Sequence, residues 1–174
     1  MACAMARHHR IDPGRVATPA GMPAPPPRSI NMSRPVGYTP PAEGADTELA
    51  RRFPLALISP AGRNSTFASL SWHRDRTGPP RVHLHPDDVA ARGLADGDAA
   101  RVHNDRGEFL ATVAVDDATR PGLAFTYKAY WARLSPGGST VNAVTGVRDT
   151  DLGGGPTFHD TRVQVEAAPA GQLP

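Results

Sequence analysis

The fold can be worked out from residues 81–108, which have the sequence RVHLHPDDVAARGLADGDAARVHNDRGE. Alternating polar and apolar residues over 81–85 predict a strand. Residues 86–93 predict a short helix, because proline lies in the first turn, two aspartates follow at the positive end, and a glycine ends it. Residues 100–103 alternate again, and Asn-Asp-Arg-Gly at 104–107 is typical of a hairpin turn. This stretch therefore predicts a strand, a short helix and a β-hairpin.

Apolar segments on both sides of this stretch extend the β pattern. Residues 53–59, FPLALIS, form a short and nearly continuous apolar run, as in a buried strand. Further strands are expected at 108–115, 122–128 and 161–166. About six short strands with one or two short helices between residues 53 and 168 predict a mainly β protein, folded as a small β-barrel.

Two connections of this expected barrel are longer than its topology requires. They span residues 60–80 and 129–158, and both are rich in Gly, Ser, Thr and Asn. Loops of this length inside a compact domain are usually functional or disordered. Small and hydroxyl-bearing residues bring backbone and side-chain donors close to a polar ligand. These loops are the candidate binding elements.

The N-terminal part has a different composition. Residues 1–50 contain nine prolines and four glycines and show almost no periodic apolar pattern. Proline fixes φ and removes a backbone donor, so regular helix and interior strand are both disfavoured. We predict a disordered Pro/Gly-rich arm over 1–52, a barrel over 53–168 and a tail over 169–174.

Charge and composition exclude several classes of protein. The 19 basic and 17 acidic residues give a net charge of +2, and the arginines are scattered, so a nucleic-acid partner is not expected. No apolar run reaches the ~20 residues of a transmembrane helix, and the N-terminus lacks the apolar stretch of a secretory signal. Cys3 is the only cysteine, which excludes an internal disulfide or a four-cysteine cluster within this chain. A cytoplasmic protein is expected.

The stretch 81–108 closely resembles the core signature of the molybdopterin-dinucleotide-binding domain. That domain closes the C-terminal end of large molybdenum and tungsten oxidoreductases of the dimethyl sulfoxide reductase superfamily. Residues 57–73, LISPAGRNSTFASLSWH, resemble the family's first cofactor loop. Residues 128–166 resemble its terminal segment, including Asn-Ala-Val-Thr at 142–145. The resemblance covers roughly 53–168 and implies a double-psi β-barrel.

The resemblance also implies a ligand, molybdopterin guanine dinucleotide, in which a pyrophosphate joins a pterin to guanine. Backbone amides, hydroxyls and a guanidinium suit the phosphates, and an Asn side chain suits a purine or pterin edge. The implied cofactor-binding residues are Gly62, Arg63, Asn64, Ser65, Thr66, Trp72, His73, Lys128, Asn142, Thr145 and Asp151. Taken one at a time, such residues also cap ordinary turns; as a set in the family's order they favour binding.

In this family the metal ligand and most cofactor contacts come from other domains. The resemblance therefore implies a cofactor-holding part of an oxidoreductase, as a terminal domain, a remnant or a subunit. We expect the molybdenum or tungsten to be carried by other domains, the partner to be a separate catalytic molybdoenzyme chain, and the isolated chain not to be catalytic.

Other functions remain open on the residues alone. A double-psi barrel can also serve as a non-enzymatic interaction module that no longer binds a cofactor. His83 and His85 lie two apart on one strand, a spacing that can hold a metal ion. His159 and Asp160 could form an acid–base pair, although no nucleophile elbow such as GxSxG accompanies them.

Overall fold

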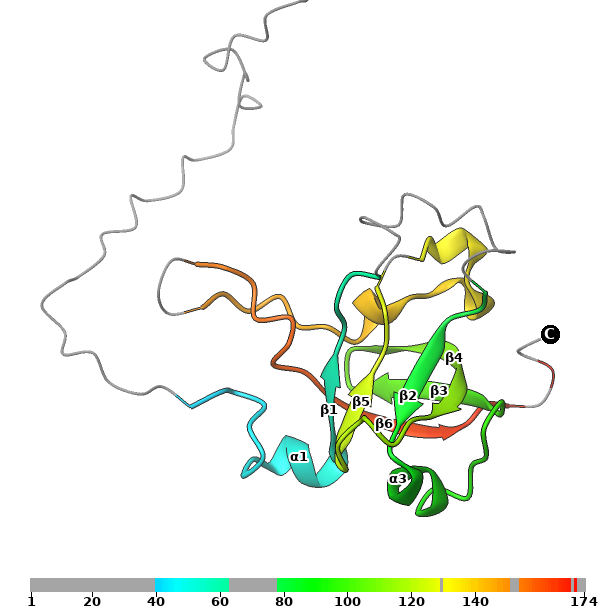
Figure 1. The fold of residues 1–174 in the computed structure, drawn as a ribbon. Coiled ribbons are helices and arrows are strands. Elements are labelled where there is room, and N and C mark those ends of the chain that lie inside the picture. The colour runs from blue at the N-terminus through cyan, green and yellow to red at the C-terminus, as the bar shows by residue number, and fades with distance from the viewer. Residues whose placement is uncertain (1–39, 63–77, 129, 151–153, 170, 172–174) are drawn as a thin grey trace, which may run out of the picture. The chain divides into compact units, whose positions relative to one another are not determined.

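Six short strands close into a barrel in this computed structural model (Figure 1). The strands are β1 (Leu55–Ile58), β2 (Arg81–Leu84), β3 (Ala99–Asn104), β4 (Gly107–Val115), β5 (Leu123–Phe125) and β6 (Arg162–Ala167). The structure describes residues 40–62, 78–128, 130–150, 154–169 and 171. All of them belong to one compact unit.

The strands follow one another around the barrel in the order β1-β5-β2-β4-β3-β6. The pairs β1/β5 and β2/β4 are parallel, and the other four pairs are antiparallel. Closure pairs each of the six described strands with a neighbour on both sides, so none of these strands is an edge strand. The prediction of a mainly β barrel with few short helices is confirmed, and the two parallel pairs are compatible with the double-psi arrangement.

The barrel interior is filled by the inward-facing residues of all six strands. In β3 the burial alternates along the strand, with Ala100, Val102 and Asn104 inside, and β6 begins in the same way with Val163 and Val165. Branched side chains suit this role because they pack well on a pleated surface. The largest fully buried apolar residues are Leu55, Leu57, Val82, Leu84, Val102, Val113, Val144, Val163 and Val165.

Helix α3 (Pro86–Ala90) forms where the sequence predicts it. Pro86 lies in the first turn, and the His85 side chain accepts a hydrogen bond from the Asp87 amide (3.1 Å), so His85 caps the helix. Gly93, with φ of +63°, reverses the chain after the helix as expected. The Asp88 carboxylate also accepts from the Gly122 amide (2.7 Å), which fixes the turn before β5 against this helix.

The segment just before the barrel differs from the prediction of an arm without regular structure. Within residues 40–52, helix α1 (Glu48–Arg52) begins after Thr47, whose hydroxyl accepts from the Ala50 amide. Glu43 is anchored to β6 by the Arg162 amide, which donates to its carboxylate (2.7 Å). Composition missed this segment because long-range contacts hold it, not a local apolar pattern. The rest of the predicted arm lies outside the described residues, as does most of the predicted tail.

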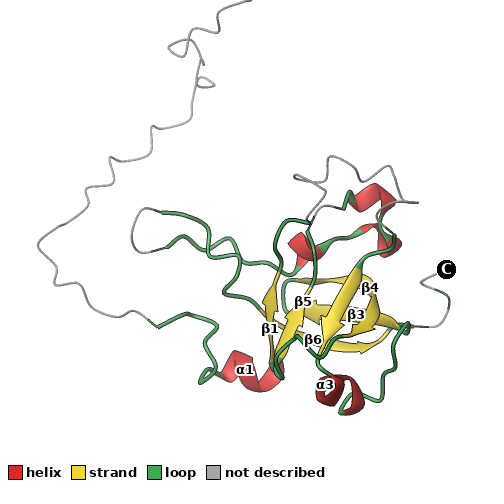
Figure 2. Cartoon of the chain, viewed as in Figure 1, coloured by secondary structure: helices red, strands yellow, loops and turns green. Residues whose placement is uncertain are grey.

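The long connection between β5 and β6 carries three short 3₁₀ helices. They are η1 (Ala132–Leu134), η2 (Pro136–Gly138) and η3 (Val141–Ala143). Figures 1 and 2 show them at one end of the barrel, with α1 and α3 at the other. Among the described residues, no helix has the length and apolar character to cross a membrane.

Candidate functional site

Two strand ends lie side by side at the end of the barrel that carries the 3₁₀ helices. The chain beyond β1 and the chain beyond β5 remain parallel, with an isolated bridge between Ala61 and Lys128. The Lys128 amide donates to the Pro60 carbonyl (3.0 Å). Gly62 follows directly on Ala61. The fold therefore brings Gly62, from the first of the two long loops, beside Lys128, which directly precedes the second.

A pocket opens at this end between the chain after β5 and the 3₁₀ helices. Its lining residues include aromatic, hydroxyl-bearing and apolar residues, one asparagine and one lysine, and none of its described residues is acidic. The lining residues are Pro80, Phe109, Thr126, Tyr127, Lys128, Tyr130, Ser135, Ser139, Thr140, Val141 and Asn142. The lining therefore offers hydrogen-bond donors beside an apolar surface, a combination typical of binding sites for polar ligands.

The Asn142–Thr145 turn presents one amide side chain on the rim of this pocket. Asn142 lies in η3 and is exposed, and its side chain forms no hydrogen bond with the part of the chain that the structure describes. The Thr145 hydroxyl donates to the Asn142 carbonyl (3.1 Å), and Val144 is fully buried beneath them. Thr145 and Val144 thus hold the backbone of the turn while the Asn142 amide remains available.

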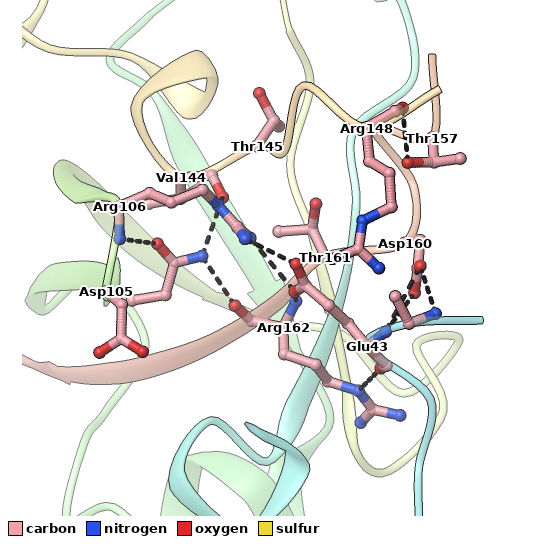
Figure 3. Close-up of polar contacts among 12 residues, drawn as sticks. Glu43, Asp105, Arg106, Val144, Thr145, Arg148, Thr157, Asp160, Thr161 and Arg162 are labelled. Atoms are coloured by element: carbon pink, nitrogen blue, oxygen red, sulfur yellow. Dashed lines mark hydrogen bonds and ion pairs between the residues drawn. The ribbon is translucent and has the colours of Figure 1, made fainter. Parts of the chain in front are cut away.

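Two residues of the β3–β4 hairpin hold the turn through its Val144 carbonyl, and Figure 3 labels one of them, Arg106. The side-chain amide of Asn104 and the Nε of Arg106 both donate to the Val144 carbonyl, each at 2.8 Å. Asn104 is buried, and its side-chain oxygen accepts from the Arg106 amide (3.0 Å). Sequence reasoning assigned Asn104 and Arg106 only to a hairpin turn. No local signal marks their contact with Val144, because the loop folds over the hairpin from a distant part of the chain.

Lys128 and Tyr130 line the pocket from the segment after β5. The Lys128 ammonium lies over the ring of Phe158, 4.8 Å from its centroid. The Tyr130 hydroxyl donates a long hydrogen bond to the Pro79 carbonyl (3.4 Å). Burial raises the pKa of Tyr130 above its ordinary value, an effect that nearby Arg81 partly opposes. The phenol therefore stays neutral and able to donate at physiological pH.

Four of the expected site residues belong to the part of the chain that the structure describes. Gly62, Lys128, Asn142 and Thr145 all lie at the pocket end of the barrel. Seven residues of the expected set lie outside the described residues: Arg63, Asn64, Ser65, Thr66, Trp72, His73 and Asp151. Ser139, which is not among the expected site residues, also lines the pocket, and its hydroxyl donates to the Glu108 carbonyl (2.7 Å).

The alternative candidates have other roles in the structure. His85 caps α3, and His83 packs edge-on against Phe125, with ring centroids 5.5 Å apart. Across the described ranges, no three His, Cys, Asp or Glu side chains are grouped so as to hold a metal ion. Asp160 accepts from the Ala42 and Glu43 amides at 2.9 and 3.2 Å, which gives this carboxylate a structural role.

Comparison with known proteins agrees with this geometry. The sequence pattern of the family described as "Molydopterin dinucleotide binding domain" matches residues 59–162, which include the whole pocket lining. The chain is 33% identical over 138 residues to biotin sulfoxide reductase of Cereibacter sphaeroides, covering 73% of this chain and 18% of that protein. It is 56% identical over 48 residues to dimethyl sulfoxide/trimethylamine N-oxide reductase of Rhodobacter capsulatus, covering 28% of this chain and 6% of that protein.

A solved structure shows the same fold. Acetylene hydratase from Pelobacter acetylenicus matches with a TM-score of 0.61 and 20% identity, over 76% of this chain and 21% of that one. This chain thus spans less than about a quarter of the length of each of these proteins. The barrel, its pocket end and the match over 59–162 together confirm the resemblance seen in the sequence: the chain belongs to the molydopterin dinucleotide binding domain family.

Proposed function

We propose that the pocket end of the barrel holds molybdopterin guanine dinucleotide, as the cofactor-binding part of a molybdenum or tungsten oxidoreductase. One observation carries this proposal. The chain after β5 and Asn142 of the Asn142–Thr145 turn line a single pocket whose described lining contains no carboxylate, and the Ala61–Lys128 bridge joins the chain after β1 to the chain after β5. Each of these three segments belongs to a part of the sequence that resembles the family's cofactor loops.

The chemistry of the lining fits such a cofactor. A lysine ammonium suits a pyrophosphate, and the Asn142 amide offers both a donor and an acceptor to the edge of a purine or pterin. The Tyr127 side chain is 41% exposed beside the pocket and offers a flat face on which a fused ring can stack. When bound, the cofactor supplies redox chemistry through its metal. The residues of this chain bind and orient it.

The partner and the compartment are part of the same proposal. The chain covers a small share of its relatives, so further domains or a separate catalytic molybdoenzyme chain would supply the metal ligand and the remaining contacts. We place this assembly in the cytoplasm, as the sequence led us to expect. The double-psi assignment is supported by the parallel pairs β1/β5 and β2/β4 within a closed barrel.

A titration with guanosine diphosphate tests the proposal, because this probe contains the guanine, the ribose and a pyrophosphate. We expect weak binding, with a Kd of about a millimolar, because much of the ligand would stay in water. Amide chemical shifts should change at Lys128, Asn142 and Thr145, but not in the turn of residues 116–122 at the other end of the barrel. Adenosine diphosphate serves as the control for the base, and inorganic pyrophosphate as the control for the phosphates.

No shift change at these residues with several millimolar guanosine diphosphate would reject the proposal. That result would favour the non-enzymatic reading, in which the barrel binds another protein. Equal changes with pyrophosphate alone would support a phosphate site but would reject recognition of guanine.

A further inference from the structure

Glu43 belongs to the short segment before the barrel, and its carboxylate binds Arg106, which contacts the Asn142–Thr145 turn. We propose that Glu43 is a positioning residue for this turn and that it acts through Arg106. This inference rests on the proposed function, in which the turn contacts the cofactor. Neither the resemblance nor the match over 59–162 includes residue 43.

Glu43 holds Arg106 by both ends of its guanidinium group (Figure 3). The two terminal nitrogens of Arg106 donate to the two carboxylate oxygens of Glu43, at 2.6 and 3.1 Å. The Glu43 side chain is only 11% exposed and that of Arg106 is 33% exposed, so solvent weakens this pair less than a surface pair. Bidentate pairs of this kind fix orientation as well as distance.

The third nitrogen of the same guanidinium group touches the turn. Arg106 Nε donates to the Val144 carbonyl at 2.8 Å. The guanidinium group is planar and rigid. Because Glu43 binds its two terminal nitrogens, Glu43 also fixes the direction in which the Nε–H bond points. Val144 is fully buried, and two residues earlier Asn142 projects onto the pocket rim. The position of the Asn142 backbone is therefore coupled to the Glu43 carboxylate.

Glu43 is itself held by contacts that do not involve the turn. Its amide donates to Asp160 (3.2 Å), and its carbonyl accepts from Arg162 Nε (2.9 Å). Its carboxylate also accepts from the Arg162 amide (2.7 Å). Backbone and side chain are thus fixed to the start of β6, which makes Glu43 a rigid support for Arg106. A mobile surface glutamate could not orient a partner in this way.

A neighbouring ion pair offers a matched control. Arg52, in α1, donates through two nitrogens to the Asp105 carboxylate, at 2.8 and 2.5 Å. This pair also joins the segment before the barrel to the β3–β4 hairpin, one residue away from Arg106. The hydrogen bonds to the Val144 carbonyl come from Asn104 and Arg106 and not from Asp105, and the side chains of Arg52 and Asp105 are both more than half exposed. If the amides of residues 142–145 respond to any loosening of the segment before the barrel, they should also respond to a substitution at Asp105.

The first test uses the full chain without ligand. In Glu43→Gln, which keeps the side-chain shape but removes the charge, amide shifts of residues 142–145 should change and their hydrogen exchange should accelerate. In Asp105→Asn the same amides should keep their wild-type shifts. Unchanged amides in Glu43→Gln, or equal changes in both variants, would overturn the inference. Because no ligand is present, this test shows whether Glu43 positions the turn even if guanosine diphosphate fails to bind and the proposed function is rejected.

The second test measures guanosine diphosphate affinity. We expect Glu43→Gln to weaken binding by about 2- to 30-fold, the range seen for residues that act through an intermediate contact. Asp105→Asn should leave the affinity within about twofold, the scatter expected of surface substitutions. In an Arg106→Ala background, Glu43→Gln should cause no further loss, because the residue through which it acts is gone. If Glu43→Gln lowered the affinity as much in the Arg106→Ala background as in wild type, Glu43 would not act through Arg106. Wild-type affinity in Glu43→Gln alone would lead to the same conclusion.

Discussion

A substitution of Asn142 is the most direct way to change ligand binding without changing the stability of the fold. In the structure the Asn142 side chain is exposed, lies on the pocket rim and forms no hydrogen bond within the described part of the chain. Replacing it by alanine removes a donor and an acceptor from the pocket, but leaves the backbone of the turn to Thr145 and Val144. Asn142→Ala should therefore affect the ligand and spare the fold.

The magnitudes follow from this environment. A ligand group that loses its polar partner costs about 1–3 kcal/mol. That corresponds to a loss of about 5- to 150-fold in guanosine diphosphate affinity. An exposed substitution away from structural contacts changes the free energy of unfolding by less than about 0.5 kcal/mol.

Titration calorimetry and urea denaturation measure the two quantities on the same preparation. Asp117→Ala is the control, because Asp117 is exposed in the turn after β4, at the other end of the barrel. The guanosine diphosphate affinity and the free energy of unfolding of this variant should match those of the wild type. Affinity of Asn142→Ala within twofold of wild type would refute the role of the amide. A loss of more than about 1 kcal/mol in stability would refute the reasoning that its side chain does no structural work.

The remaining predictions concern the support of the turn. Asn104→Ala removes the three hydrogen bonds of a buried side chain, which together contribute about 3 kcal/mol. The Tm should therefore fall by about 10 °C in a thermal scan. A decrease in Tm of less than about 3 °C would contradict this prediction. Gly107→Ala places a Cβ 3.0 Å from the Ala143 carbonyl oxygen, and we expect about 1 kcal/mol of destabilisation with shifted amides in residues 142–145, as seen by NMR. Because burial raises the pKa of Tyr130, its phenol loses its proton at a lower pH in the unfolded chain than in the folded protein. The free energy of unfolding should therefore be unchanged below about pH 10 and decline as the pH rises through the pKa of the folded state. Urea titrations of wild type and Tyr130→Phe at pH 9 and 11 should show this decline to be smaller in the variant.

The sequence by itself determined the local elements and the family. Residues 86–93 carry proline, two aspartates and a terminal glycine at helix positions, and the structure has α3 there. The Asn-Asp-Arg-Gly turn and the alternating residues on both sides produce the β3–β4 hairpin. These signals lie within a few residues of one another, so local propensity and side-chain period suffice to specify them. Lys128, Asn142 and Thr145 were identified through the family's residue order.

The tertiary structure alone decided how these pieces meet. The pairing of β1 with β5 joins segments far apart in the chain, and it brings Ala61 against Lys128. The ordered segment at 40–52 could not be inferred from composition, because Glu43 is held by Arg106 and Arg162, each distant in sequence. The same applies to Arg106, which in the sequence is one residue of a turn and in the fold supports the Val144 carbonyl. Contacts of this kind depend on the closure of the barrel, and closure is a property of all six strands together that no short segment encodes.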